Sequence, residues 1–279
     1  MGVVAILGAG LLGAGMVGNL RQRGVEVRVW NRSPGKLAPL VALGAVAAES
    51  PAEAVAGVER VHLVLSADDA VDEVIAALRP SLPAGAPIYD HSTNLPTRVA
   101  SRYTTLRAEG VRYLHCPVFM GPANARNGTG LMLAAGPAQE VADAEPILLT
   151  MTGKLWNVGE RPDLAAVYKL LGNGVLIGLT GVLGDTLRVG AASGLDAEAV
   201  ATLFQHFNPA GMLPFATQRI ARAGADPTSF ALEMARKDVR LMLETAGEGA
   251  LVLPAIAERM DAAIAAGHGQ ADYAIFAKP

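Results

Sequence analysis

The feature that most restricts the fold is a glycine-rich segment, Gly8-Ala9-Gly10-Leu11-Leu12-Gly13, which lies between two apolar patterns. The residues before it, Val3–Leu7, form an uninterrupted apolar run typical of a buried strand. Helical periodicity follows over Leu11–Arg23, and a second strand pattern occupies Val25–Trp30. In this strand–turn–helix–strand context, the G-x-G-x-x-G spacing predicts a dinucleotide-binding Rossmann turn. The alternative is a structural turn that binds no ligand.

Each glycine of that motif has a physical role. Gly8 permits the tight turn, Gly10 lets the backbone approach a pyrophosphate, and Gly13 allows close packing of helix and strand. Leu11 and Leu12 open the helix, whose free N–H groups and positive dipole end attract phosphate. We therefore expect residues 8 to 13 to bind the cofactor.

The end of the second strand indicates which cofactor is used. NAD-binding forms usually carry an acidic residue there for the ribose 2′-hydroxyl. This chain has no carboxylate at that place but offers four polar or cationic side chains, Asn31, Arg32, Ser33 and Lys36. Because guanidinium pairs well with phosphate, the pattern favours NADP(H). The alternative is a solvated loop.

Strand and helix patterns alternate through the first half of the chain, which predicts a doubly wound, largely parallel sheet. Further strands are expected at 61–65, 88–90, 114–118 and 130–134, and helices at 36–43, 52–56, 70–78 and 97–109. The predicted fold is α/β: an N-terminal Rossmann domain, residues 1–160, and an all-α C-terminal domain, residues 161–279, joined by a long interdomain helix.

That long helix is expected over Asp163–Ala192. Later helices are predicted from Asp196 to Phe204, from the Asp226–Ser229 segment to Ala246, and from Pro254 to about Gly267. A stripe of small residues in the long helix, Gly174, Gly178, Gly181 and Gly184, indicates an interdomain or subunit interface.

Composition narrows the class of protein. The formal net charge is -3 and no long basic run occurs, which argues against nucleic acid or an anionic membrane as a partner. The N-terminal twenty residues are uncharged, but glycines crowd them and no basic segment precedes them. A buried strand and helix face explain that stretch without a membrane. The lone Cys116 is expected in the core, and a cytoplasmic setting fits best.

Four further motifs follow the glycine loop in order. These are Asp90-His91-Ser92-Thr93-Asn94-Leu95-Pro96, Pro117–Thr129, Lys169-Leu170-Leu171-Gly172-Asn173 and Lys237-Asp238-Val239. Together they give the chain a resemblance to the β-hydroxyacid dehydrogenases over nearly its whole length. The resemblance implies Lys169 and Asn173 as catalytic residues. It implies substrate contacts from Ser92, Phe119, Met120, Gly121 and Lys237. It also implies cofactor contacts from Leu65, Ser66, Thr93 and Lys237.

One segment departs from the family pattern. Phe119-Met120-Gly121 stands where the family has Ser-Gly-Gly, so a serine hydroxyl and one glycine beside the substrate are absent. The resulting pocket is bulkier and more apolar than is usual in the family. Lys237 has a further alternative, that of an ordinary solvent-facing helix lysine.

Lys169 carries the expected chemistry. Oxidising an alcohol needs a base for the hydroxyl proton, and the reverse reduction needs an acid. A lysine with a lowered pKa can do both. Asn173 follows one turn later on the same helix face.

We therefore expect an NADP(H)-dependent dehydrogenase or reductase acting on CH–OH groups of a small β-hydroxyacid, or on the corresponding semialdehyde. A homodimer or homotetramer is expected, with a small-molecule substrate and no metal site, because the five histidines lack metal-ligand spacing. Two alternatives are an imine reductase on the same scaffold, against which Lys169 counts, and a catalytically inert cofactor-binding module.

Overall fold

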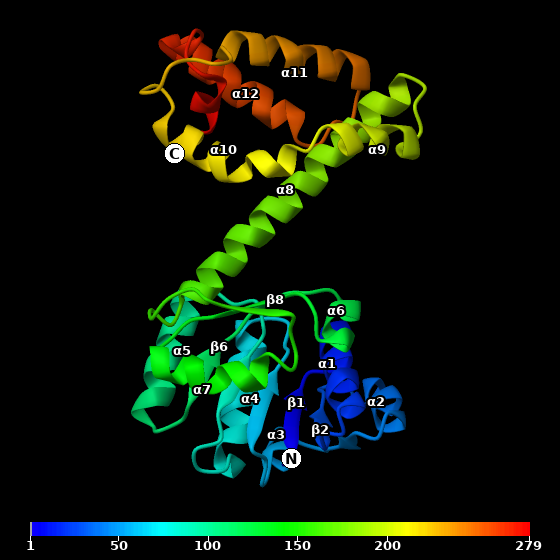
Figure 1. The fold of residues 1–279 in the computed structure, drawn as a ribbon, viewed down its shortest axis with the longest axis vertical. Helices are drawn as coiled ribbons and strands as arrows, with labels where there is room; N and C mark the ends of the chain where they lie inside the picture. The colour runs from blue at the N-terminus through cyan, green and yellow to red at the C-terminus, as the bar shows by residue number, and fades with distance from the viewer. Residues whose placement is uncertain (1) are drawn as a thin grey trace. The chain divides into compact units, whose positions relative to one another are not determined.

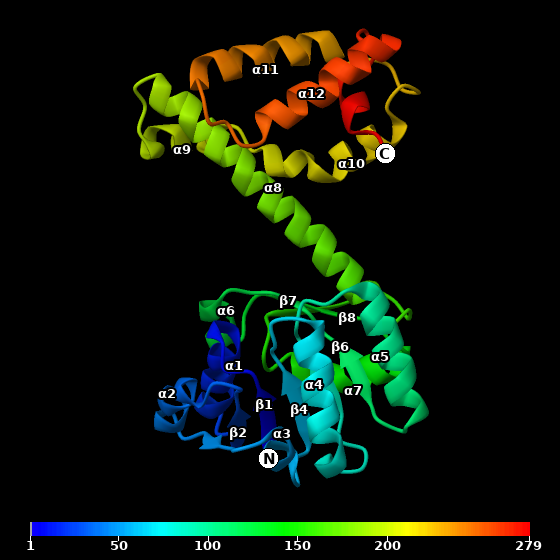
Figure 2. The ribbon, with the colours of Figure 1, turned by 180° about the vertical axis from the view of Figure 1, so that it is seen from behind.

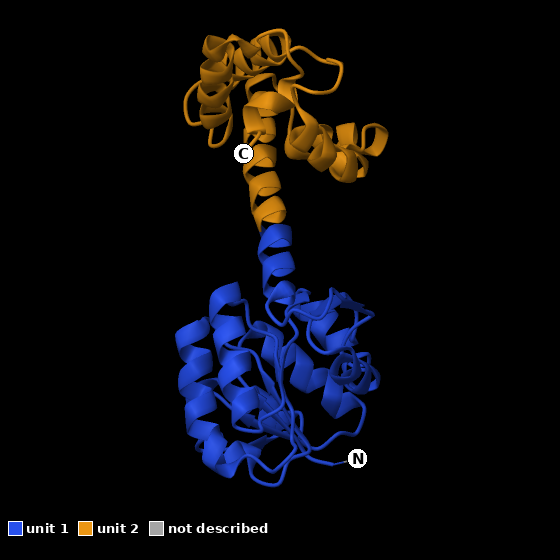
Figure 3. Cartoon of the chain, turned by 90° about the vertical axis from the view of Figure 1, so that its left-hand side faces the viewer, with its two compact units in different colours: residues 1–173 blue, residues 174–279 orange. Residues whose placement is uncertain are grey.

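A computed structural model describes residues 2–279 of the chain (Figure 1). It divides into two compact units, coloured separately in Figure 3: unit 1 ends at Asn173, and unit 2 is Gly174–Pro279. The division falls inside one long helix, α8 (Leu164–Ala192). The domain boundary at 160/161 stays a prediction.

Unit 1 alternates strands and helices as the sequence predicted. Its strands are β1 (Val4–Leu7), β2 (Val27–Trp30), β3 (Val46–Ala47), β4 (Arg60–Leu63), β5 (Ile88–Asp90), β6 (Tyr113–His115), β7 (Val118–Phe119), β8 (Leu131–Ala134) and β9 (Lys154–Asn157). Its α-helices are α1 (Leu11–Gln22), α2 (Ala38–Ala42), α3 (Pro51–Val55), α4 (Asp68–Leu78), α5 (Pro96–Ala108), α6 (Pro122–Asn127) and α7 (Ala138–Leu148). Two short 3₁₀ turns occupy Pro34–Lys36 and Arg79–Ser81.

The main sheet has six strands in the order β3-β2-β1-β4-β5-β6, all parallel. This is the strand order of the Rossmann fold, and the order reverses between β1 and β4. The predicted α/β class, with a parallel doubly wound sheet, is therefore confirmed. In such sheets the crevice at the reversal is where ligands bind.

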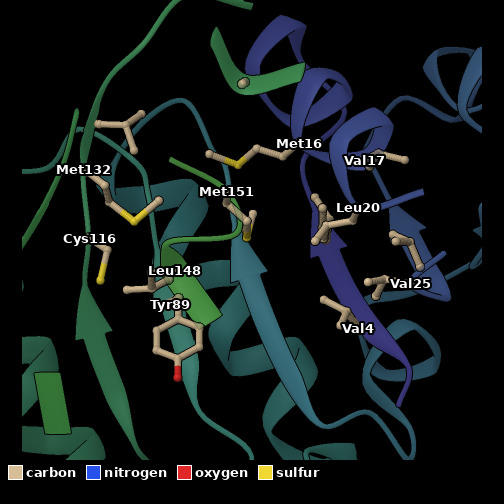
Figure 4. Close-up of a cluster of buried hydrophobic side chains, with 14 of the residues drawn as sticks. Val4, Met16, Val17, Leu20, Val25, Tyr89, Cys116, Met132, Leu148 and Met151 are labelled. Atoms are coloured by element: carbon tan, nitrogen blue, oxygen red, sulfur yellow. The ribbon is translucent and has the colours of Figure 1, made fainter. Parts of the chain in front are cut away.

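Different helices cover the two faces of this sheet, because alternate residues of a strand point in opposite directions. Val4 and Ile6 join the core cluster of α1 and α7, drawn in part in Figure 4, and Ala5 and Leu7 join the cluster of α4 and α5. Figure 2 shows the same layers from behind. All four residues of β1 are fully buried, which explains the charge-free N-terminal segment. Cys116 is buried in the first cluster, as predicted.

The predicted strand over residues 114–118 is wrong as a single element. It is divided between β6 in the main sheet and β7 in a second, three-stranded sheet of order β7-β8-β9. Pro117 lies between them and has no N–H to continue a ladder, so the chain changes sheets there. In the second sheet β7 pairs antiparallel with β8, and β8 pairs parallel with β9.

Unit 2 is helical, as expected. After its part of α8 come α9 (Ala197–His206), α10 (Leu213–Arg222), α11 (Leu232–Ala246) and α12 (Leu253–Ala263). Short turns of 3₁₀ or π type occupy Pro209–Met212, Ile264–His268 and Tyr273–Ala277. Asp196 caps α9 by accepting from the Ala199 N–H. The sequence predicted only a turn where α10 follows, and it placed the start of α11 too early.

Candidate active site

A cavity of about 510 Å³ lies at the carboxyl ends of four parallel strands, β1, β2, β4 and β5. It therefore occupies the reversal point of the strand order, where the fold predicts ligand binding. Its lining consists of Gly8, Gly10, Leu12, Trp30, Asn31, Arg32, Ser33, Lys36, Val64, Leu65, Ser66, Ala70, Glu73, Val74, His91, Ser92 and Thr93. Most of the predicted cofactor residues are brought together here.

The glycine loop has the geometry that its motif demands. Gly8 has φ +115°, and a Cβ there would lie 2.1 Å from the carbonyl oxygen of Val64. A Cβ on Gly13 would lie 2.0 Å from the Gly8 carbonyl oxygen, so both positions require glycine. Gly10 is different, since a Cβ would meet no heavy atom within 4 Å among the described residues. The space above Gly10 is open for a ligand to approach the backbone.

The N-terminus of α1 lies at the cavity, and no side chain of its first turn neutralises the positive end of the helix dipole. Gly10 is its N-cap, no side chain caps it, and its first turn contains no acidic residue. Free N–H groups and the helix dipole suit a pyrophosphate at this place. Leu12 lines the cavity, whereas the Leu11 side chain is 80% exposed and is not part of the lining.

At the end of β2 the four predicted residues all line the cavity but differ in what their side chains do. Asn31 is used within the protein: its Oδ1 accepts from the Ala9 N–H at 2.9 Å, and its Nδ2 donates to the Ser33 carbonyl at 2.9 Å. It therefore ties the glycine loop to the next loop. Arg32 and Lys36 are exposed, and neither forms an ion pair with any residue of the described range 2–279. Both cations are available to an anionic ligand.

The ends of β4 and β5 are joined through Ser92. The Leu65 N–H donates to Ser92 Oγ at 3.0 Å, and the Ser92 N–H donates to Asp90 Oδ1 at 2.9 Å. Ser92 is buried, whereas Thr93 and Ser66 are exposed at the cavity wall. Of this group, Thr93 and Ser66 offer hydroxyls with the freest access to a ligand.

Beneath this wall runs a buried hydrogen-bond chain that the sequence did not predict. Arg60 Nε donates to His62 Nε2 at 3.3 Å, which leaves the His62 proton on Nδ1. That Nδ1 lies 2.9 Å from His91 Nε2, and His91 Nδ1 lies 2.8 Å from the Cys116 carbonyl oxygen. With both histidines neutral, each of their four ring nitrogens has a hydrogen-bond partner.

Burial disfavours charging these histidines. It lowers the pKa of His91 to about 4 and the pKa of His62 well below its usual range. Burial also lowers the pKa of His115, whose Nε2 lies 3.0 Å from the Ser92 carbonyl oxygen. His91 lines the cavity, so its ring contributes an uncharged part of the wall at neutral pH.

A second group of predicted residues lies where α8 begins, against the small sheet. The Lys169 Nζ donates to the Val118 carbonyl at 2.7 Å and lies 4.3 Å from the centre of the Phe119 ring. Lys169 is only 9% exposed, and burial lowers the pKa of its amine. Asn173 is half-buried one turn further along the helix. The lysine thus has the setting that acid–base work requires.

The remaining predicted residues are more scattered. Met120 is half-buried against Gly130, and Gly121 caps α6, its N–H donating to Asn124 Oδ1 at 3.0 Å. Lys237 belongs to unit 2, where it is about half-exposed and lies 3.0 Å from Asp238 Oδ1. None of these three residues, and neither Lys169 nor Phe119, is among the lining of the described cavity.

Sequence reasoning missed several of the lining residues, notably Trp30, Glu73 and His91. Trp30 ends a strand that was predicted, and its ring was read only as part of the apolar run. Glu73 lies on α4. In the sequence, a charged helix residue that faces solvent cannot be distinguished from one that lines a cavity. Among residues 2–279, no group of three or more His, Cys, Asp or Glu side chains has metal-binding geometry.

Comparisons with known proteins agree with the geometry. Residues 3–159, more than half of the chain, match the NAD binding domain of 6-phosphogluconate dehydrogenase. The chain is 30% identical to 3-sulfolactaldehyde reductase of Escherichia coli (strain K12), over 98% of this chain and 94% of that protein. It is 29% identical to 3-hydroxyisobutyrate dehydrogenase of Pseudomonas aeruginosa, over 87% of this chain and 85% of that protein.

The fold also matches solved structures over its length. An imine reductase from Myxococcus stipitatus, solved in complex with NADP⁺, superposes with a TM-score of 0.87 at 23% identity, covering 99% of this chain and 98% of that one. At this identity the likeness concerns the fold alone. Ordered motifs, fold and relatives together establish that the chain belongs to the β-hydroxyacid dehydrogenase family of NAD(P)-dependent oxidoreductases.

Proposed function

We propose that the protein is an NADP(H)-dependent dehydrogenase or reductase of a small β-hydroxyacid or the corresponding semialdehyde, with Lys169 as general acid and base. The observation that carries this proposal is the buried Lys169 amine, whose pKa burial lowers and whose Nζ is held by the Val118 carbonyl. A solvent-facing helix lysine would have neither property. The relatives named as a sulfolactaldehyde reductase and a hydroxyisobutyrate dehydrogenase support the substrate class.

The cavity supports NADP(H) in particular. Arg32, Ser33 and Lys36 line it at the end of β2, where an acidic residue would repel a 2′-phosphate. Gly10 and the uncapped start of α1 suit the pyrophosphate. Leu65, Ser66 and Thr93 are proposed to contact the ribose and nicotinamide portion. When bound, the nicotinamide accepts or supplies the hydride.

Lys169 accepts or donates the proton of the substrate oxygen. In alcohol oxidation the neutral amine takes the hydroxyl proton as the hydride leaves carbon. In reduction the ammonium gives a proton to the oxygen of the carbonyl group. Among residues 2–279 the Lys169 ammonium donates one hydrogen bond, to the Val118 carbonyl, so two of its three Nζ hydrogens remain for a substrate oxygen. We propose that Asn173 orients the amine, and that Ser92, Phe119, Met120, Gly121 and Lys237 contribute to the substrate site.

An imine reductase is the second candidate, supported by the fold shared with the Myxococcus enzyme and by the apolar Phe119. An inert cofactor-binding module is the third, and the burial of Lys169 counts against it. Purified protein mixed with NADPH and a panel of semialdehydes, simple aldehydes and cyclic imines separates the three by absorbance at 340 nm. Turnover of imines alone, or of nothing while NADPH still binds, would overturn the leading proposal.

We also propose a cytoplasmic homodimer or homotetramer. Helix α8 is long and apolar enough to cross a membrane by length and composition alone, and 6% of an apolar 18-residue window within it is buried. Among the described residues, a Cβ on Gly174 or Gly178 would meet nothing within 4 Å, whereas one on Gly181 would meet Val252 at 2.7 Å. Part of the glycine stripe is thus packed within unit 2, and the rest is free to receive a second copy.

A further inference from the structure

We propose that Phe119 determines substrate specificity, by requiring an uncharged, apolar group beside the reacting carbonyl on the side that faces Lys169. This inference rests on the proposed function and narrows its substrate class. It favours aldehydes whose neighbouring carbon belongs to a hydrocarbon chain, including semialdehydes with a remote carboxylate. It disfavours aldehydes that carry a carboxylate directly on the carbonyl carbon.

The ring of Phe119 takes up space next to the proposed acid–base group. Its centre lies 4.3 Å from Lys169 Nζ, so one side of the amine is covered by an aromatic face. The Val118 carbonyl takes a second direction at 2.7 Å. In the proposed binding mode, a substrate oxygen that reaches the remaining Nζ hydrogens has its flanking group next to the ring.

The ring is held in that place by the surrounding chain. Phe119 pairs with Leu131 in the small sheet and packs against a buried cluster formed by Leu133, Ala135 and Ala165. On the helix side it depends on Gly172, because a Cβ there would lie 2.3 Å from the ring Cζ. The glycine one turn from Lys169 thus makes room for the phenyl group, and the two residues act as a matched pair.

The phenyl face of Phe119 makes the binding of an adjacent anion unfavourable. A phenyl face offers no hydrogen-bond donor, and its electron density repels a carboxylate. A carboxylate placed there would lose its water without gaining a partner, except by competing with the carbonyl oxygen for Lys169. A hydrocarbon group loses nothing and gains buried apolar surface.

The decisive variant is Phe119→Ser, compared with Phe119→Leu, which removes the ring but keeps an apolar wall. Wild type should prefer butanal and 4-oxobutanoate to glyoxylate in kcat/KM with NADPH. Phe119→Ser should lower the butanal-to-glyoxylate ratio by about ten-fold or more, and Phe119→Leu should preserve it. Trp156→Ser is the matched control, because Trp156 lies in the same small sheet but packs against Tyr168. An unchanged ratio in Phe119→Ser would overturn the inference.

A second measurement needs no turnover and so separates this inference from the proposed function. Oxamate and isobutyramide are amides of similar shape, one with a carboxylate and one with an isopropyl group beside the carbonyl. The wild-type NADPH complex should bind isobutyramide more tightly in a fluorescence titration, and Phe119→Ser should lose that preference. Equal binding by wild type would overturn the inference even if aldehydes are reduced. Failure to reduce any aldehyde would overturn only the proposed function.

Gly172→Ala supplies an independent check if Phe119→Ser is poorly folded by circular dichroism. Its Cβ must displace the ring, so it should reduce the preference for isobutyramide in wild type. In the Phe119→Leu background the same change should have a smaller effect, because the two residues are in contact and their effects are not additive. Additive effects would show that Gly172 and Phe119 act separately, and would count against the proposal.

Discussion

At the scale of single residues, the most informative change is at Lys169. Lys169→Ala should lower kcat by about 10²–10⁴-fold, the usual value of a positioned acid–base group. Lys169→Arg should not restore activity, because a guanidinium keeps its proton at every accessible pH. NADPH affinity, measured by fluorescence titration, should barely change, since the cavity lining does not include Lys169. Turnover close to wild type in the alanine variant would assign the proton to another group.

The pH dependence of that reaction has a defined sign. Burial lowers the pKa of Lys169, so the neutral amine is present at lower pH than for an exposed lysine. Alcohol oxidation should rise as pH increases through this lowered pKa, and carbonyl reduction should fall through the same range. Steady-state profiles in both directions check this, and the limb should vanish in Lys169→Ala.

Arg32 is the residue that we expect to select the phosphorylated cofactor. Arg32→Asp should reduce the ratio of kcat/KM for NADPH over NADH by about ten-fold or more, because it replaces an attraction to the 2′-phosphate with a repulsion. Arg112→Asp makes the same charge change in unit 1 but outside the cavity, and it is the control. Equal use of the two cofactors by wild type would contradict the assignment.

At the scale of elements, apolar runs and the glycine motif were sufficient to predict five of the six strands of the main sheet and ligand binding at its carboxyl edge. They were insufficient for the exposed elements. Both residues of β3 are exposed, and most of β9 is too, so neither has an alternating apolar pattern. The start of α11 was misplaced because Ser229 and Ala231 are tied to Asp272, more than forty residues away. Local sequence carries no sign of such pairing.

The same limit applied within the site. The motifs identified the residues that a ligand would meet, including Gly8, Gly10 and Arg32. They did not show that the Asn31 amide is used to bond Ala9, because that pairing depends on two strands lying side by side. The sequence predicted that Phe119 makes the substrate pocket bulkier. It did not predict that the ring packs on Gly172, because that contact exists only when the small sheet lies against α8.

The histidine chain across β4 and β5 should make stability depend on pH. Folding lowers the pKa of His91 to about 4 and that of His62 well below its usual range, so the unfolded chain binds more protons at acidic pH. The contribution of these histidines to the free energy of unfolding is fully present above about pH 6.5. It is lost as pH falls toward about 4, by up to about 1.4 kcal/mol per pH unit for each histidine.

Urea unfolding between pH 4.5 and 7.5 measures this effect. His62→Gln removes one of the titrating groups, so its stability should fall less steeply with acidification than that of wild type. Parallel curves for the two proteins would show that the buried histidines do not contribute to the acid sensitivity.

At the scale of the whole molecule, α8 should decide the oligomeric state. Ile177 is 69% exposed, and Leu176 and Leu179 beside it are exposed as well. Ile177→Glu places a charge in this apolar surface and should convert a dimer or tetramer to a smaller species in light scattering after gel filtration. Val46→Glu adds the same charge at an exposed apolar position of β3 and should leave the mass unchanged. A monomeric wild type would contradict the proposal.

Because the boundary between the units falls inside α8, we expect a cut there to damage the proposed chemistry. A fragment that ends at Asn173 keeps every residue of the cavity lining but only the first ten residues of the helix that carries Lys169. So short a helix end frays in water, since its last carbonyls have lost their partners. Such a fragment would bind the cofactor without activating an alcohol, whereas one extended to Ala192 would retain an intact helix around the lysine. On the proposed function, the cavity that would hold the cofactor is lined by residues of unit 1, whereas moving the proton would depend on a helix that both units share.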